Sequence, residues 1–97
     1  MQKNSRENYE KLYKAVLSLK DEKECADFFE DLFTFQELTS IAQRLEIASQ
    51  ISKGKSYNEV NKLMGVSTTT ICRVGRSLNY GTGGYKMVLD RLDDDNA

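Results

Sequence analysis

The chain has 97 residues, a formal net charge of −1, and neither proline nor histidine. Its many Leu, Glu, Lys and Gln residues predict a single all-α domain, which at this size buries about 60–65% of its unfolded surface and is expected to self-associate. The lack of histidine and of a CxxC pair excludes a zinc site, and the lack of a long apolar run or a secretory start predicts a cytoplasmic protein with no membrane contact and no cofactor.

Three amphipathic helices are predicted in the first half of the chain. The first spans Ser5–Lys20 and carries its apolar side chains on one stripe. Asp21 is expected to cap the second helix, and Thr34 to begin the third in a capping box with Glu37. Gly54 is expected to end the third helix in the left-handed conformation.

The first two helices carry more apolar surface than a small domain can cover. Each Å² of apolar surface removed from water stabilises the fold by about 25 cal/mol, so large exposed stripes are unfavourable. We therefore predict a homodimer, in which these two helices and a last helix near Tyr85–Leu92 meet the same elements of a second chain. The alternative is that these apolar stripes pack against the third helix of the same chain.

Residues 56–78, SYNEVNKLMGVSTTTICRVGRSL, form a predicted helix-turn-helix. Ser56 can cap the first of its two helices and Ser67 the second, while Gly65 stands where the chain must turn. Residues 53–80 contain five basic side chains against one acidic, so that positive charge is concentrated here although the whole chain is slightly negative. This unit is the candidate DNA-reading element.

The second helix of the unit separates apolar from polar side chains. Ile71 and Val74 are expected to point inward, leaving hydroxyl and guanidinium groups outside, a surface that suits phosphates and base edges. Arg73 and Arg76 are the candidates for guanine edges or phosphates. The full set of candidate DNA-binding residues is Lys53, Lys55, Tyr57, Asn58, Ser67, Thr68, Thr69, Thr70, Cys72, Arg73 and Arg76.

Two of these assignments have alternatives. Thr70 either reaches a base or serves only to stabilise the start of its helix. Cys72 is either a redox-sensitive thiol beside the arginines or a plain small side chain. No catalytic residue is proposed, because no nucleophile with a base and no phosphate-cradling glycine motif is present, so the protein is not expected to be an enzyme.

The end of the chain is expected to be less ordered. Residues 79–84, NYGTGG, are expected to form a flexible loop before the last helix. The acidic tail, residues 93–97, has nothing to pack and is expected to be disordered. The predicted organisation is thus one helical domain over residues 1–92 followed by this tail.

The run from Leu32 to Leu78 is similar to the tryptophan repressors, and more closely to the Trp repressor-like YerC/YecD family. The resemblance rests on an arginine in the third helix, the turn glycine, and a T-I-x-R run in the second helix of the helix-turn-helix, which is called the reading helix below. It implies an intertwined helical dimer with two heads about 34–36 Å apart on double-stranded DNA, acting as a sequence-specific repressor of transcription. The other function left open is a helical protein–protein interaction module without DNA binding.

The resemblance also identifies positions that would hold a small-molecule effector. In tryptophan repressors these are a threonine before the third helix, an arginine within it, an arginine of the reading helix and a serine one turn later; Thr34, Arg44, Arg73 and Ser77 occupy them here. The repressors have a glycine where this chain has Val74, and a valine would block the indole ring. L-Tryptophan is therefore not expected to bind, and another effector stays open.

Overall fold

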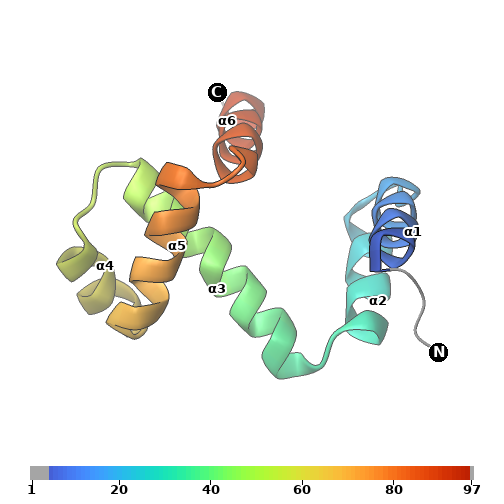
Figure 1. Ribbon diagram of the computed structural model, residues 1–97, viewed down its shortest axis with the longest axis horizontal. Helices are drawn as coiled ribbons and strands as arrows, with labels where there is room; N and C mark the ends of the chain where they lie inside the picture. The colour runs from blue at the N-terminus through green and yellow to red at the C-terminus, as the bar shows by residue number, and fades with distance from the viewer. Residues whose placement is uncertain (1–4, 97) are drawn as a thin grey trace. The chain divides into compact units, whose positions relative to one another are not determined.

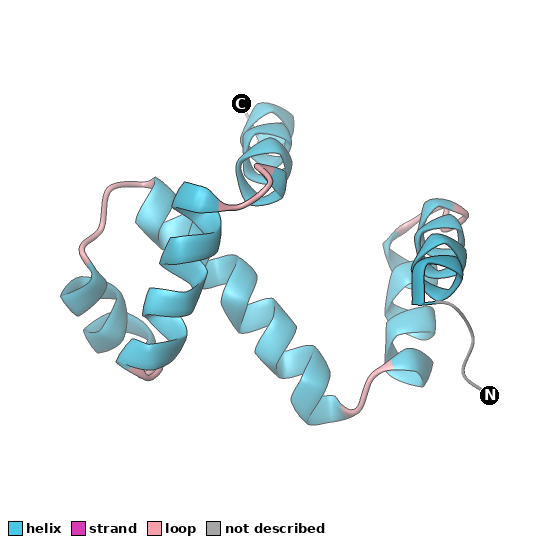
Figure 2. Ribbon diagram, in the orientation of Figure 1, coloured by secondary structure: helices cyan, strands magenta, loops and turns pink. Residues whose placement is uncertain are grey.

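The computed structural model describes residues 5–96, with side chains described for residues 5–93, and these residues form six α-helices (Figures 1 and 2). No strand occurs in the described range, so the all-α prediction is confirmed. The helices are α1 Ser5–Leu17, α2 Glu22–Leu32, α3 Phe35–Ser52, α4 Tyr57–Met64, α5 Thr68–Tyr80 and α6 Gly84–Asn96.

The chain divides into two compact units, residues 1–38 and residues 39–97, with the boundary inside α3. In the first unit, neither α1 nor α2 contains a buried residue. The rings of Phe29 and Phe33 meet edge to face with centroids 5.5 Å apart, yet the stripe of α1 stays open, with Tyr13 60% exposed. The single helical domain expected over residues 1–92 stays a prediction.

The second unit has a continuous core. Buried apolar side chains from α3, α4, α5 and α6 form one cluster, with Ile51, Met64 and Tyr85 packed against it. This core fixes the two helices of the predicted reading unit to the end of α3 and to α6. The buried residues are Ile47, Ala48, Val60, Val66, Ile71, Val74 and Leu89.

Local side-chain hydrogen bonds set the helix starts as predicted. Asp21 caps α2 by accepting from the backbone N–H of Glu24 at 2.9 Å. Thr34 and Glu37 form the expected capping box, with reciprocal bonds of 2.9 and 3.1 Å. Gly54, with a φ of 98°, follows the end of α3 in a conformation that favours glycine.

Two helices end at residues other than those predicted. α1 ends at Leu17 rather than Lys20, because the Ser18 hydroxyl donates back to the carbonyl of Ala15 at 2.6 Å and the chain must become extended to cap α2. α5 continues to Tyr80, so the loop before α6 contains three residues instead of six. The helix gains a backbone hydrogen bond with each residue it adds, which favours this extension.

The predicted disorder of the tail, residues 93–97, is also corrected for most of its length. α6 begins at Gly84 and extends to Asn96, so residues 93–96 are helical, and Ala97 lies outside the described residues. A helix that has already formed can extend at low cost even without tertiary contacts, because each further residue adds a backbone hydrogen bond.

Candidate nucleic-acid interface

A complete capping box begins α4. The backbone N–H of Glu59 donates to Ser56 Oγ at 3.1 Å, and the backbone N–H of Ser56 donates to Glu59 Oε1 at 3.2 Å. The bond from the Ser56 backbone lowers the pKa of the Glu59 carboxyl, and the Ser56 side chain and the charge of Lys55 lower it further. The carboxylate thus stays ionised and holds the N-terminus of α4 in place.

The turn between α4 and α5 is fixed by one glycine and one half-buried side-chain amide. Gly65 adopts the left-handed conformation, with φ 69° and ψ 20°, and its N–H donates to the carbonyl of Asn61 at 2.9 Å. The side chain of Asn61 then donates to the carbonyl of Val66 at 2.7 Å, in a half-buried position. The predicted turn at Gly65 is confirmed, and the hydrogen bond between Asn61 and Val66 locks it.

Ser67 caps α5 as predicted. Its Oγ accepts from the backbone N–H of Thr70 at 3.2 Å and lies 2.9 Å from the hydroxyl of Thr70. Thr70 is half-buried, whereas its neighbours Thr68 and Thr69 are exposed. Of the two interpretations of Thr70, this geometry favours the one in which its hydroxyl stabilises the start of the helix.

The outward face of α5 is open and positively charged. Ile71 is fully buried and Val74 is 1% exposed, which confirms the predicted inward positions. The ion pairs Lys23–Asp27 and Lys86–Asp90 both lie away from this face. Five exposed residues line one shallow hollow on it: Thr68, Thr69, Cys72, Arg73 and Arg76. Since neither guanidinium group is paired with an acidic side chain of the described residues, both are available to phosphates or base edges.

The remaining candidate DNA contacts lie around the start of α4. Lys53 is exposed just after α3, and Lys55 is half-buried in the link that follows. Asn58 is exposed in the first turn of α4. Tyr57, beside it, is 38% exposed, and its ring lies against Gly75 of α5. The structure therefore gives Tyr57 a contact within the protein that the sequence reasoning did not include.

The candidate effector residues do not share one hollow. Arg44 and Ser77 line a groove of about 710 Å³ together with apolar side chains of α3 and α6. Arg73 lines the hollow on the outer face of α5 instead, and Thr34 caps α3 in the other compact unit. Val74 belongs to the buried core. The valine thus has the packing role that the sequence suggested for it.

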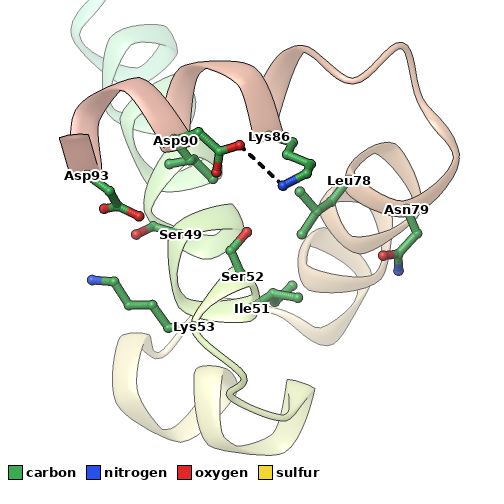
Figure 3. Close-up of a pocket in the computed structure, with 10 residues that line it drawn as sticks. Ser49, Ile51, Ser52, Lys53, Leu78, Asn79, Lys86, Asp90 and Asp93 are labelled. Atoms are coloured by element: carbon green, nitrogen blue, oxygen red, sulfur yellow. Dashed lines mark hydrogen bonds and ion pairs between the residues drawn. The ribbon is translucent and has the colours of Figure 1, made fainter.

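Another hollow, separate from the one on the outer face of α5 and from the groove beside Arg44, lies where α3, α5 and α6 meet (Figure 3). Side chains of both signs of charge line it: Lys86 pairs with Asp90 at 3.2 Å, and Lys53 and Asp93 also line the hollow.

Among the described residues no group of three or more His, Cys, Asp or Glu residues could hold a metal ion. Within the same residues, no helix is both long and apolar enough to cross a membrane.

The sequence reasoning missed two features of this region. Lys62 lines a hollow on the outer face of α4 together with Lys55, so it extends the basic surface; it contributed to the local charge but was not among the candidate contacts. The packing of Tyr57 on Gly75 was also missed. A glycine inside a predicted helix, one residue before Arg76, is the pattern that could have pointed to it.

The chain is similar to known proteins over most of its length. Residues 7–93 match the family model described as Trp repressor protein. The chain is 47% identical over 85 residues to YerC of Bacillus subtilis, described as an uncharacterized protein, and the match covers 88% of this chain and 82% of YerC. Its fold is similar to that of a TrpR-like protein from Eubacterium eligens, with a TM-score of 0.85 and 44% identity over 93% of this chain and 96% of that one. A structure from Staphylococcus aureus has a TM-score of 0.84 and 42% identity, covering 89% and 86% of the two chains.

Proposed function

We propose that this chain, which belongs to the Trp repressor protein family, is a DNA-binding regulator of transcription. It would recognise a specific operator as a homodimer and repress the adjacent gene. The family match covers the helix-turn-helix, and the family consists of regulators rather than enzymes. The regulator would act in the cytoplasm, on double-stranded DNA.

The observation that carries this proposal is the outer face of α5. It presents two unpaired arginines and two exposed threonine hydroxyls beside Cys72. Arginine forms bidentate hydrogen bonds with guanine and also binds phosphates, while threonine can contact thymine methyl groups through its own methyl. Lys53, Lys55 and the first turn of α4 would contact the phosphate backbone beside the reading helix.

The exposed stripes of α1 and α2 support the homodimer. Within one chain Tyr9 is 58% exposed, Tyr13 60% and Leu17 83%, and neither helix contains a buried residue. Apolar surface of this extent is the kind that a second copy covers. A dimer also supplies two reading helices, which is how helix-turn-helix proteins address palindromic sites.

L-Tryptophan is not part of the proposed mechanism. Val74 lies in the core, 1% exposed, at the position where tryptophan repressors have the glycine beside the ligand. DNA binding is therefore proposed to occur without tryptophan. Arg44 and Ser77, which share a groove with an apolar lining, leave room for a different effector.

Selection of bound sequences from a pool of random duplexes by the purified protein tests this function. Recovery of a palindrome with half-sites one helical turn apart would support the function, the dimer and the use of both reading helices together. A pool that shows no enrichment after repeated rounds at moderate salt would contradict it. The contradicting outcome would favour the alternative, an interaction module that binds another protein through its exposed apolar helices.

A further inference from the structure

The ring of Tyr57, the first residue of α4, lies against Gly75 in the middle of α5. Gly75 is buried, and a Cβ atom placed on it would overlap the Tyr57 hydroxyl and lie 2.7 Å from Cζ and 3.3 Å from Cε1 of the ring. The ring therefore occupies the space that any other side chain at position 75 would need.

The backbone does not explain this glycine. The glycines with positive φ in the described residues are Gly54, Gly65 and Gly83, and Gly75 has ordinary helical geometry. A glycine in the interior of a helix is unfavourable compared with alanine, because it has more conformational freedom to lose on folding. The close approach of the Tyr57 ring is the feature that requires it.

This contact joins α4 and α5 at a second point. At one end of α4 the Asn61 side chain bonds the carbonyl of Val66 across the turn. At the other end the Tyr57 ring rests on Gly75, which directly precedes the exposed Arg76. Because α4 is held to the turn through Asn61 and to the middle of α5 through Tyr57, the two contacts together restrict the separation and the crossing angle of the helices, and so where the outer face of α5 lies relative to α4.

We propose that Tyr57 is a positioning residue of the reading unit: its ring, seated on Gly75, sets the spacing of α4 and α5 and so the depth at which Arg76 and its neighbours enter the major groove. This role rests on the proposed DNA-binding function. This role is additional to the contact with the DNA backbone that the sequence predicted for Tyr57.

Thermal unfolding of a double-mutant cycle tests the packing. When Tyr57 is present, Gly75→Ala should lower the melting temperature, because the new methyl group displaces the Tyr57 ring. In a Tyr57→Ala background the same substitution should raise it, because the obstacle is gone and alanine favours the helix. Gly84→Ala is the control, since a Cβ there meets only the Thr82 hydroxyl oxygen, at 3.7 Å, and should have the same effect in both backgrounds.

An equal effect of Gly75→Ala in the two backgrounds would overturn the packing claim. Should the single variant be too unstable to purify, recovery of a folded protein when Tyr57→Ala is added would support the claim. A double variant that also fails to fold, while Tyr57→Ala alone folds, would contradict it.

DNA binding then tests the positioning role. Affinity is measured for a duplex selected by the unaltered protein and for a scrambled duplex of the same length. Gly75→Ala should lower the ratio of the two affinities about tenfold, as loss of a base contact does, while binding of the scrambled duplex changes little because the basic side chains remain. A merely structural defect lowers the folded fraction and reduces both affinities by the same factor.

The two possible failures are distinguishable. An unchanged affinity ratio in folded Gly75→Ala would overturn the positioning role and leave the proposed function standing. Failure of the unaltered protein to bind any duplex would overturn both.

Discussion

Arg73 and Val74 are neighbours in α5, yet the first side chain is exposed and the second is buried. Arg73 is exposed and lines the outer hollow, whereas Val74 is 1% exposed and belongs to the core. α5 thus combines an exposed, positively charged surface with a buried position, Val74, at which the resemblance to tryptophan repressors places a glycine.

The position of Val74 predicts the response to L-tryptophan. Isothermal titration calorimetry with millimolar tryptophan should detect no binding heat with the unaltered protein, because the valine occupies the required space. Val74→Gly removes this obstacle and should recover weak binding, although the change should also cost roughly 3 kcal/mol of stability. Val74→Ala is the control, since it removes less volume. A micromolar isotherm with the unaltered protein would contradict this prediction.

The exposed guanidinium of Arg76 predicts a loss of specific affinity on truncation. Arg76→Ala should weaken binding to the selected duplex by about 1–3 kcal/mol if the side chain reads a base pair. Fluorescence anisotropy on selected and scrambled duplexes measures the difference. Lys11→Ala, an exposed cation on α1, is the matched control and should change neither affinity. Equal weakening on both duplexes would reassign Arg76 to the phosphates.

The basic surface around α4 and α5 predicts a strong dependence on salt. If the dimer neutralises six to eight phosphates, log K should fall against log salt concentration with a slope of about −5 to −7. Anisotropy titrations between low and moderate potassium chloride concentrations give the slope. Lys55→Ala should make it shallower, because one phosphate contact per chain is lost. A slope near zero in the unaltered protein would count against recognition of DNA through its backbone.

The capping box of α4 predicts a specific pH dependence of stability. The pKa of Glu59 in the folded chain lies below its ordinary value of 4.5, because the carboxylate accepts a hydrogen bond from the backbone of Ser56. Its contribution is therefore fully present above pH 4.5 and is lost as the pH falls through the lower, folded value. Urea unfolding of the protein and of Glu59→Gln between pH 7 and pH 3 should show a difference that shrinks on acidification. A difference that stays constant would contradict the assignment.

The open stripe of α1 predicts the oligomeric state. Analytical ultracentrifugation should give a mass twice that of the 11.1 kDa chain. Tyr13→Asp, which places a charge on the stripe, should shift the mass toward the monomer. Lys11→Asp is the control, because it carries a charge of the same sign on the opposite face of the helix and should leave the dimer intact. A monomer at high concentration would contradict the proposal.

Local chemistry accounts for what the sequence predicted well. Caps and turns depend on residues three or four apart, so Thr34 with Glu37, Ser56 with Glu59, and the glycine at position 65 could all be recognised from the sequence. The inward and outward faces of α5 followed from helical periodicity in the same way.

The features that the sequence did not predict depend on tertiary packing. The contact of Tyr57 with Gly75 joins residues eighteen positions apart on two helices, and no periodicity within either helix encodes it. The length of α5 was underestimated because Asn79 and Tyr80 precede a glycine-rich stretch and resemble a loop, although they continue the helix. The candidate effector residues follow from the resemblance alone and stay a prediction; within one chain Arg44 and Arg73 line separate hollows.

The absence of any buried residue in α1 and α2 within one chain has a consequence for gene dosage. Helices without a fully buried residue gain part of their stability from a partner, so in the proposed homodimer dilution favours the separated chains. The fraction of an operator that is bound by the dimer would then rise more steeply than the number of protein chains made per cell. A modest change in synthesis could switch the target gene, with no small molecule required.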